Sequence, residues 1–212
     1  MDFTLRFRIK SCGESTMKFR ITLIYLQKIT IFLLVLIYLS CEIQAEAPED
    51  EPGTYRDLTE ALQNSLDVRI LILSEQKLTT LPKKIEQLKN LQVLNLSSNQ
   101  LTTLPKEIGK LENLQVLNLG SNRLKTLPKG IEQLKNLQTL YLNYNQLTTL
   151  PREIGRLQSL TKLHLQHNQI ATLPDEIIQL QNLRKLTLYE NPIPPQELDK
   201  IRKLLPNCEI RF

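Results

Sequence analysis

The chain has 212 residues, 41% of them hydrophobic and 23% charged, which is enough for one domain with a continuous core and too few for several. Its formal net charge is +5, but residues 1–45 contain six Lys or Arg and three Asp or Glu, so the rest of the chain is nearly balanced. Neither a basic stripe nor the cysteine density of a disulfide framework is present, which argues against a nucleic-acid partner and a disulfide scaffold.

Residues 17–45 have the three-part layout of a secretory signal peptide. A basic flank with Lys18, Arg20 and Lys28 precedes an apolar run of eleven residues, and the segment ends at the small residue Ala45. We therefore expect export. A membrane anchor is the alternative, and the charge of Lys28 within the longer apolar span weakens it.

Two processing routes are open for residues 1–45, the N-terminal extension and signal peptide. Cleavage after Ala45 leaves Glu46 at the mature N-terminus, and this is the route we favour. Lipidation of Cys41 is the other route, because the residues before it match a lipoprotein box loosely. A chain that begins at Met17 has the same leader.

Residues 46–53 are acidic and contain two prolines, so they predict a solvated linker. The ordered domain is expected over residues 54–212, and it begins with an N-terminal cap at 54–67. Thr54 and Asp57 resemble a capping box. Apolar residues near one helical face predict a short helix that covers the first repeat: Tyr55, Leu58, Leu62 and Leu66.

One pattern of 23 residues recurs six times without a gap over residues 68–205. Residues 91–113 show it in full, as LQVLNLSSNQLTTLPKEIGKLEN. The leucines two apart at its start predict a strand with one face turned inward. The Leu-Pro pair, with the Ile and Leu that follow it, predicts a short helical return segment. One copy cannot bury these residues alone, so the copies must stack into a solenoid.

Every copy after the first has an asparagine three residues after its second strand leucine. An asparagine amide both donates and accepts hydrogen bonds, so at a buried turn it can satisfy backbone groups that have lost water. We expect an internal ladder of these side chains, with Gln76 in place of the first: Asn99, Asn122, Asn145, Asn168 and Asn191.

The last copy departs from the pattern. Three prolines interrupt it, and residues 196–205 have apolar residues at helical spacing. Residues 206–212 predict a C-terminal cap strand on which Cys208, Ile210 and Phe212 alternate inward. Cys208 is expected to be a buried small hydrophobe.

The LxxLxLxxNxL core followed by LPxxI resembles the leucine-rich repeat family over residues 54–212. The near-consensus copies, the leader and the C-terminal NPIPPQELDKIRKLLPNCEIRF are similar to exported leucine-rich repeat proteins of pathogenic spirochaetes. The resemblance implies an α/β fold, a right-handed solenoid with a parallel concave sheet and short helical or 3-10 segments on its convex side. It also implies an N-terminal helical cap and a C-terminal cap of one helix and one strand.

The sequence lacks the residue constellations that catalysis or metal binding needs. His164 and His167 are the only histidines, and the solenoid carries Asp175 to its far side, so three ligands do not converge. No Ser-His-Asp or Cys-His arrangement and no glycine-rich phosphate loop is found. We therefore expect a protein that is not an enzyme and has neither a cofactor nor a metal.

The positions between and just after the strand leucines are free of the repeat rule and face the concave sheet or its rim. In the first three copies they hold mostly small or aliphatic residues. In the last three they hold residues that favour interfaces, because tyrosine combines a large contact area with a polar tip. We expect a binding face there, and ordinary solvated surface is the alternative. The residues of the expected binding face are Tyr141, Tyr144, Lys162, His164, His167, Lys185 and Tyr189.

These features indicate a non-catalytic protein-protein interaction module. By resemblance its partner is a host or cell-surface macromolecule, and the protein is secreted or lies on the outer surface. The alternative is an intracellular signalling scaffold similar to small-GTPase-binding leucine-rich repeat proteins. That alternative requires a leader without function and a cytoplasmic protein.

If the leader directs export, the mature chain begins at Glu46, because the basic flank, the apolar run and Ala45 together specify that cleavage. Mass spectrometry of the cell-associated and released protein from its own cells measures the N-terminus directly. Cytosolic protein with residues 17–45 intact would exclude export. A lipid on Cys41 would select the other route.

Overall fold

The computed structural model of the chain describes residues 51–212. The leader, Cys41, Ala45 and the first five residues of the expected linker therefore lie outside the described residues. Between residues 51 and 212, every helix is too short or too polar to cross a membrane.

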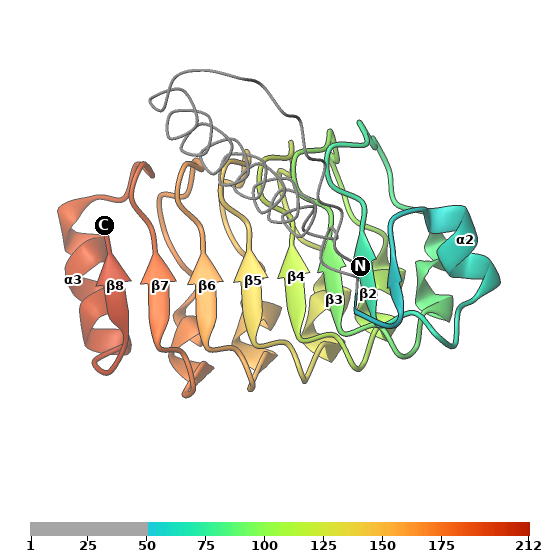
Figure 1. Cartoon of the computed structure of the whole chain (residues 1–212). Helices are drawn as coiled ribbons and strands as arrows, with labels where there is room; N and C mark the ends of the chain where they lie inside the picture. Colours follow the sequence, from blue (N-terminus) through green and yellow to red (C-terminus); the bar gives the residue numbers. More distant parts are fainter. Residues whose placement is uncertain (1–50) are drawn as a thin grey trace, which may run out of the picture. The chain divides into compact units, whose positions relative to one another are not determined.

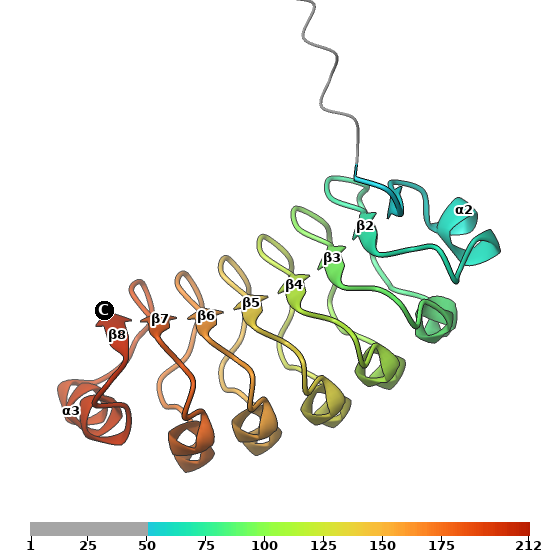
Figure 2. The ribbon, with the colours of Figure 1, turned by 60° about the horizontal axis from the view of Figure 1, so that its bottom comes forward.

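Eight parallel strands follow one another in chain order and form one curved sheet (Figure 1). Figure 2 shows the strands on the inner side of the curve and the helical segments on the outer side, which confirms the expected fold. The strands are β1 (Thr54–Tyr55), β2 (Ile70–Ile72), β3 (Val93–Asn95), β4 (Val116–Asn118), β5 (Thr139–Tyr141), β6 (Lys162–His164), β7 (Lys185–Thr187) and β8 (Glu209–Arg211). The helices are α2 (Leu58–Gln63), α3 (Pro195–Leu204) and the 3-10 helices η1 (Lys83–Gln87), η2 (Lys106–Lys110), η3 (Lys129–Gln133), η4 (Arg152–Arg156) and η5 (Asp175–Gln179).

The strand register reproduces the 23-residue period. Leu94 on β3 lies opposite Leu117 on β4, and Val93 lies opposite Val116. The middle leucine of each of these strands is buried, whereas the residues on either side of it are half-buried on the concave face. Residues 23 apart are therefore neighbours across the sheet, at a strand spacing of about 4.8 Å.

Each return segment is a 3-10 helix that starts directly after a proline. Before η2, Pro105 has φ −68° and ψ 147°, and its carbonyl accepts a hydrogen bond from the Ile108 N–H at 3.1 Å. Proline suits this place because its φ is fixed and it has no N–H to satisfy. Gly109 permits close stacking of the helices, because a Cβ there would lie 2.2 Å from the carbonyl oxygen of Gly130.

The amide of each ladder asparagine joins two consecutive repeats. Asn145 donates from Nδ2 to the carbonyl oxygen of Leu142 in its own repeat at 3.1 Å and to that of Leu119 in the preceding repeat at 2.9 Å. Its Oδ1 accepts a hydrogen bond from the Leu124 N–H at 2.9 Å. The asparagines thus bond to the backbone and not to one another, and the same three contacts recur at Asn99, Asn122, Asn168 and Asn191.

A second set of asparagines, at the last position of the copies, joins repeats along an exposed rim. Asn136 donates from Nδ2 to the carbonyl oxygen of Glu112, one repeat earlier, at 2.8 Å. Ser159 interrupts the series. The rim asparagines are also exposed, so the burial argument that predicts the ladder does not apply to them. For these two reasons the sequence alone did not identify them. The equivalents of Asn136 are Asn90, Asn113 and Asn182.

The N-terminal cap differs from the expectation in its details. Thr54 does not begin a helix, because Thr54 and Tyr55 form β1, which pairs with β2. Asp57 is the N-cap of α2 and accepts a hydrogen bond from a backbone N–H of the first turn at 2.8 Å. The expected burial of Leu66 is wrong: its side chain is 73% exposed, because α2 ends at Gln63.

Residues 51–53 belong to the fold, although the expected linker includes them. The Gly53 carbonyl accepts hydrogen bonds from the N–H groups of Arg69 at 2.9 Å and Ile70 at 3.1 Å. Gly53 has φ 85°, a conformation that glycine adopts without penalty. A Cβ there would also lie 2.5 Å from the carbonyl oxygen of Asp67.

The C-terminal cap consists of α3 and of β8, which pairs with β7. Ile210 packs against the core, but the expected inward position of Phe212 is wrong. Its ring is 38% exposed and lies 4.9 Å from the guanidinium carbon of Arg202. Cys208 is half-buried, and burial together with the charge of Glu209 raises the pKa of its thiol to about 11, so the unreactive protonated form prevails at neutral pH.

The substitution Asn145→Leu is expected to destabilise the domain. It leaves the Leu124 N–H without its partner, at about 1–3 kcal/mol for a buried group left unpaired. The carbonyls of Leu119 and Leu142 keep their hydrogen bonds from Asn122 and Asn168. Asn136→Leu is the matched control, and its exposed hydrogen bond is worth at most about 1 kcal/mol. Urea denaturation midpoints measure both variants, and equal midpoints would show that the buried ladder adds nothing to stability.

Candidate binding surface on the concave face

The seven residues of the expected binding face lie on three adjacent strands and in the loops that follow them. Tyr141 on β5 and His164 on β6 are register partners. We call Tyr141, Tyr144, His164, His167 and Tyr189 the tyrosine-histidine surface. Lys162 and Lys185 are register partners at the start of β6 and β7, and we call them the lysine pair.

The rings of the tyrosine-histidine surface are packed against one another. Tyr141 and His164 stack with centroids 4.7 Å apart and an interplanar angle of 10°. Tyr144 and His167 stack at 4.2 Å and 11°, and Tyr189 meets His167 edge-on at 5.5 Å. Such aromatic pairs contribute about 0.5–1.5 kcal/mol each beyond the area they bury. The rings are therefore ordered before any partner binds, which lowers the entropic cost of binding.

Two of these rings stand on a left-handed backbone. Tyr144 has φ 55° and His167 has φ 56°. Ser98 and Ser121 have the same conformation at the equivalent positions of earlier repeats. It is uncommon for residues other than glycine and costs roughly 1–2 kcal/mol. The sequence gives no sign of it, because these positions hold no glycine in any copy.

A side-chain hydrogen-bond network also orients His164. Its Nδ1 lies 3.1 Å from Oγ1 of Thr187, and that hydroxyl donates to Oε1 of Gln166 at 2.6 Å. Thr187 therefore accepts from the Nδ1–H of His164, and the Nε2 of the neutral ring is left as an acceptor. Neither Thr187 nor Gln166 belongs to the set expected from the sequence. The period points to Thr187, which lies 23 residues after His164.

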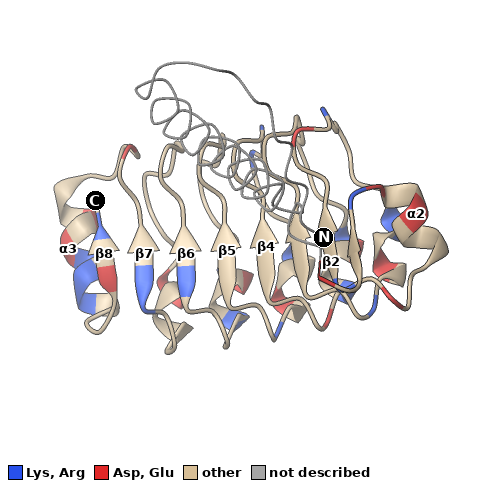
Figure 3. Ribbon diagram, in the orientation of Figure 1, with Lys and Arg blue, Asp and Glu red and all other residues tan. Residues whose placement is uncertain are grey.

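The environment of His164 keeps its ring neutral at pH 7. Burial lowers its pKa from the ordinary value of 6.5, and the positive charges of Lys185 and Lys162 lower it further. Figure 3 shows these lysines at the start of β6 and β7, whereas β2 to β5 carry no charged residue. The positive charge of the sheet face therefore begins at β6.

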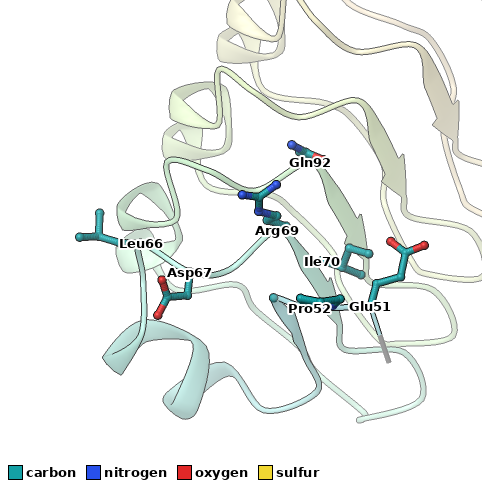
Figure 4. A pocket seen from close by; sticks show the side chains of 8 residues that line it. Glu51, Pro52, Leu66, Asp67, Arg69, Ile70 and Gln92 are labelled. Atoms are coloured by element: carbon teal, nitrogen blue, oxygen red, sulfur yellow. The ribbon is translucent and has the colours of Figure 1, made fainter. Parts of the chain in front are cut away.

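An open hollow lies at the N-terminal end of the described residues (Figure 4). Its lining includes Glu51, Asp67 and Arg69, with the exposed Leu66 beside them. These mixed charges lack the convergent polar groups over an apolar floor that typify small-molecule sites. Within residues 51–212, no group of three or more His, Cys, Asp or Glu side chains is placed to hold a metal ion.

Two family models match the chain. One, described as a leucine-rich repeat region, matches residues 49–146. The other, described as leucine rich repeat, matches residues 135–193, so the two together span most of the array. No curated protein matches the chain.

Two solved structures are similar to the chain. A leucine-rich repeat protein of Leptospira interrogans has 38% sequence identity, with 74% of this chain and 57% of that chain covered and a TM-score of 0.40. The leucine-rich repeat ectodomain of the plant membrane receptor kinase GASSHO1/SCHENGEN3 from Arabidopsis thaliana, in complex with Casparian strip integrity factor 2, has 34% identity and a TM-score of 0.57. That match covers 65% of this chain and 17% of the ectodomain. The chain therefore spans less than two thirds of either protein.

The lowered pKa of His164 predicts a domain that is less stable at acidic pH. As the pH falls past 6.5, the unfolded ring takes up a proton before the folded ring does. This contribution to stability is therefore complete above the unfolded pKa and is lost as the pH falls through the folded pKa. His164→Gln is expected to make the urea midpoint less sensitive to pH between about 7.5 and 5.

An NMR titration of the His164 ring protons measures the pKa in the wild type. Lys162→Gln/Lys185→Gln is expected to raise this pKa, because it removes two positive charges that oppose protonation. A wild-type pKa at or above 6.5 would contradict the prediction.

Proposed function

The chain belongs to the leucine-rich repeat family, a family of protein-protein interaction modules, and on that basis we propose that it binds a protein partner through the concave face of its last three repeats. The observation that carries the proposal is the ordered tyrosine-histidine surface. Tyr144 and Tyr189 are 50% and 38% exposed, so a partner meets large rings whose positions are already fixed. Tyrosines that become buried and well packed when a partner binds are common among the residues that dominate binding energy.

The first repeats supply a contrast on the same face. At the positions that hold Tyr144, His167 and Tyr189 in the later repeats, the earlier ones carry Ser97, Ser98, Gly120 and Ser121. In the row of Tyr141 and His164 the earlier repeats carry Asn95 and Asn118. Small side chains offer little area to a partner, and serine is under-represented among binding hot spots. Binding energy is therefore concentrated toward β5, β6 and β7.

A related domain supports a protein partner for this chain. The plant receptor ectodomain, 34% identical, was solved in complex with Casparian strip integrity factor 2. We place the partner of this chain outside the producing cell, as a host or cell-surface macromolecule, because the leader at residues 17–45 predicts export. The proposed role is non-catalytic and uses no cofactor.

A pull-down with the full chain and candidate cell-surface partners tests this function. Tyr141→Ala/His164→Ala removes one ring pair, and Ser97→Ala/Ser121→Ala is the control on the same face. Loss of a hot spot costs at least about 2 kcal/mol of binding, which is more than tenfold in affinity. The ring variant is expected to lose the partner and the serine variant to keep it.

Denaturation midpoints of both variants accompany the pull-down, because loss of the Tyr141–His164 stack also lowers stability by about 0.5–1.5 kcal/mol. If both folded variants bind like the wild type, the concave face of the last repeats is not the binding site. Recovery of a cytosolic small GTPase as the partner would instead support the intracellular scaffold.

A further inference from the structure

The lysine pair is uncompensated among the described residues. Lys162 is exposed and Lys185 is half-buried, and within residues 51–212 neither side chain makes an ion pair or a hydrogen bond. Glu209 is the register neighbour of Lys185, but Arg211 holds its carboxylate at 2.7 Å. Two adjacent positive charges therefore remain free on the concave face to meet an anionic group.

The row of residues that contains the lysine pair is apolar at its other end. It crosses β2 to β7 in register, and we call it the start row because it holds the first residue of each strand. The aliphatic side chains of its first three strands are half-buried, so they form an apolar strip on the concave face. In order the start row is Ile70, Val93, Val116, Thr139, Lys162 and Lys185.

We propose that the start row binds an extended peptide segment of the partner that is acidic at one end and apolar at the other. This inference rests on the proposed function and names the chemical class of the bound segment. Carboxylates meet the lysine pair, and aliphatic side chains meet Val116, Val93 and Ile70. Opposite charges across an interface favour the correct register and suppress wrong partners.

A polyanion matches the start row less well than such a peptide. The free positive charge covers only β6 and β7, whereas nucleic acids and sulfated polysaccharides carry charge along their whole length. Three strands of aliphatic surface lie where a polyanion needs further cations. The start row changes from apolar to basic at Thr139, so it fits a segment that is apolar at one end and acidic at the other.

The spacing of the strands sets the length of the segment. Five strand intervals separate Ile70 from Lys185, which is about 24 Å at about 4.8 Å per interval. An extended peptide rises about 3.3 Å per residue, so about seven or eight residues cover the row. Two intervals separate Val116 from Lys162, so the acidic and apolar residues are about three positions apart. Tyr141 and His164 lie two residues further along β5 and β6, where they are half-buried on the same face, and line the side of the segment.

A library of random twelve-residue peptides displayed on phage, selected on the immobilised full chain, tests the proposal. The wild type is expected to enrich peptides with two Asp or Glu residues about three positions from Val, Leu or Ile. Synthetic copies of the selected peptides then give affinities for variants of the start row. Lys162→Glu/Lys185→Glu is expected to weaken binding at least about tenfold, because two attractions become repulsions.

Two further variants separate the charge contribution from the apolar one. Lys106→Glu/Lys129→Glu makes the same charge change on the convex 3-10 helices, and we expect it to alter affinity less than about twofold. Val93→Thr/Val116→Thr keeps the side-chain shape and removes apolar surface. Selection on that variant is expected to keep the acidic residues and lose the aliphatic ones.

The inference is overturned by the absence of any enriched peptide, by enriched peptides without acidic residues, or by equal affinity for the wild type and Lys162→Glu/Lys185→Glu. Heparin or oligonucleotide that binds tighter than the selected peptides also overturns it, in favour of a polyanion. The pull-down judges the proposed function separately. A partner lost by Tyr141→Ala/His164→Ala and kept by the lysine variant leaves that function in place and rejects the acidic segment.

Discussion

The hydrogen bonds of the ladder asparagines fix how one repeat sits on the next. Asn122, 8% exposed, donates to carbonyl oxygens of Leu96 and Leu119 and accepts from the Leu101 N–H. A buried backbone group without a partner costs about 1–3 kcal/mol, so a turn without this amide has to open to water. Because the same amide joins every pair of neighbouring repeats, it holds all other positions of the copies in register.

Because of this register, equivalent residues of successive repeats form rows across the concave face. A residue acts on its neighbour 23 positions away more directly than on its neighbour in sequence, as the stacking of Tyr141 on His164 shows. The leucines behind the face are buried in a shared core, so their burial does not depend on which side chains stand in front of them. The face can therefore change from aliphatic to aromatic and basic between β4 and β6 without a change of fold.

The parts of the structure that the sequence predicted are those where a repeated physical need fixes the residue. A buried strand needs a leucine such as Leu117, a buried turn needs an amide such as that of Asn122, and the return segment needs a residue without an N–H, such as Pro128. The same residue types therefore recur at these positions in the other copies. The cap has no copies, and the exposure of Leu66 depends on where α2 ends. The contact of His164 with Thr187 depends on side-chain rotamers, which spacing alone does not determine.

The positions that the repeat pattern does not fix differ in which side chains their backbone favours. Tyr141 and His164 stand on strands, where aromatic rings fit the pleated surface well. Tyr144 and His167 stand on left-handed backbone, which is least favourable for bulky side chains. Ser121 adopts the same left-handed conformation in its repeat.

The fold alone therefore gives no reason for rings at these two positions. Their stack at 4.2 Å offsets part of the backbone cost, but only while both rings are present. Loss of either ring leaves the other on an unfavourable backbone without its stacking partner, so the two residues are energetically coupled. The left-handed conformation recurs at the same position of every copy, so it belongs to the repeat. What distinguishes Tyr144 and His167 is their stack, which Tyr189 extends by meeting the His167 ring edge-on.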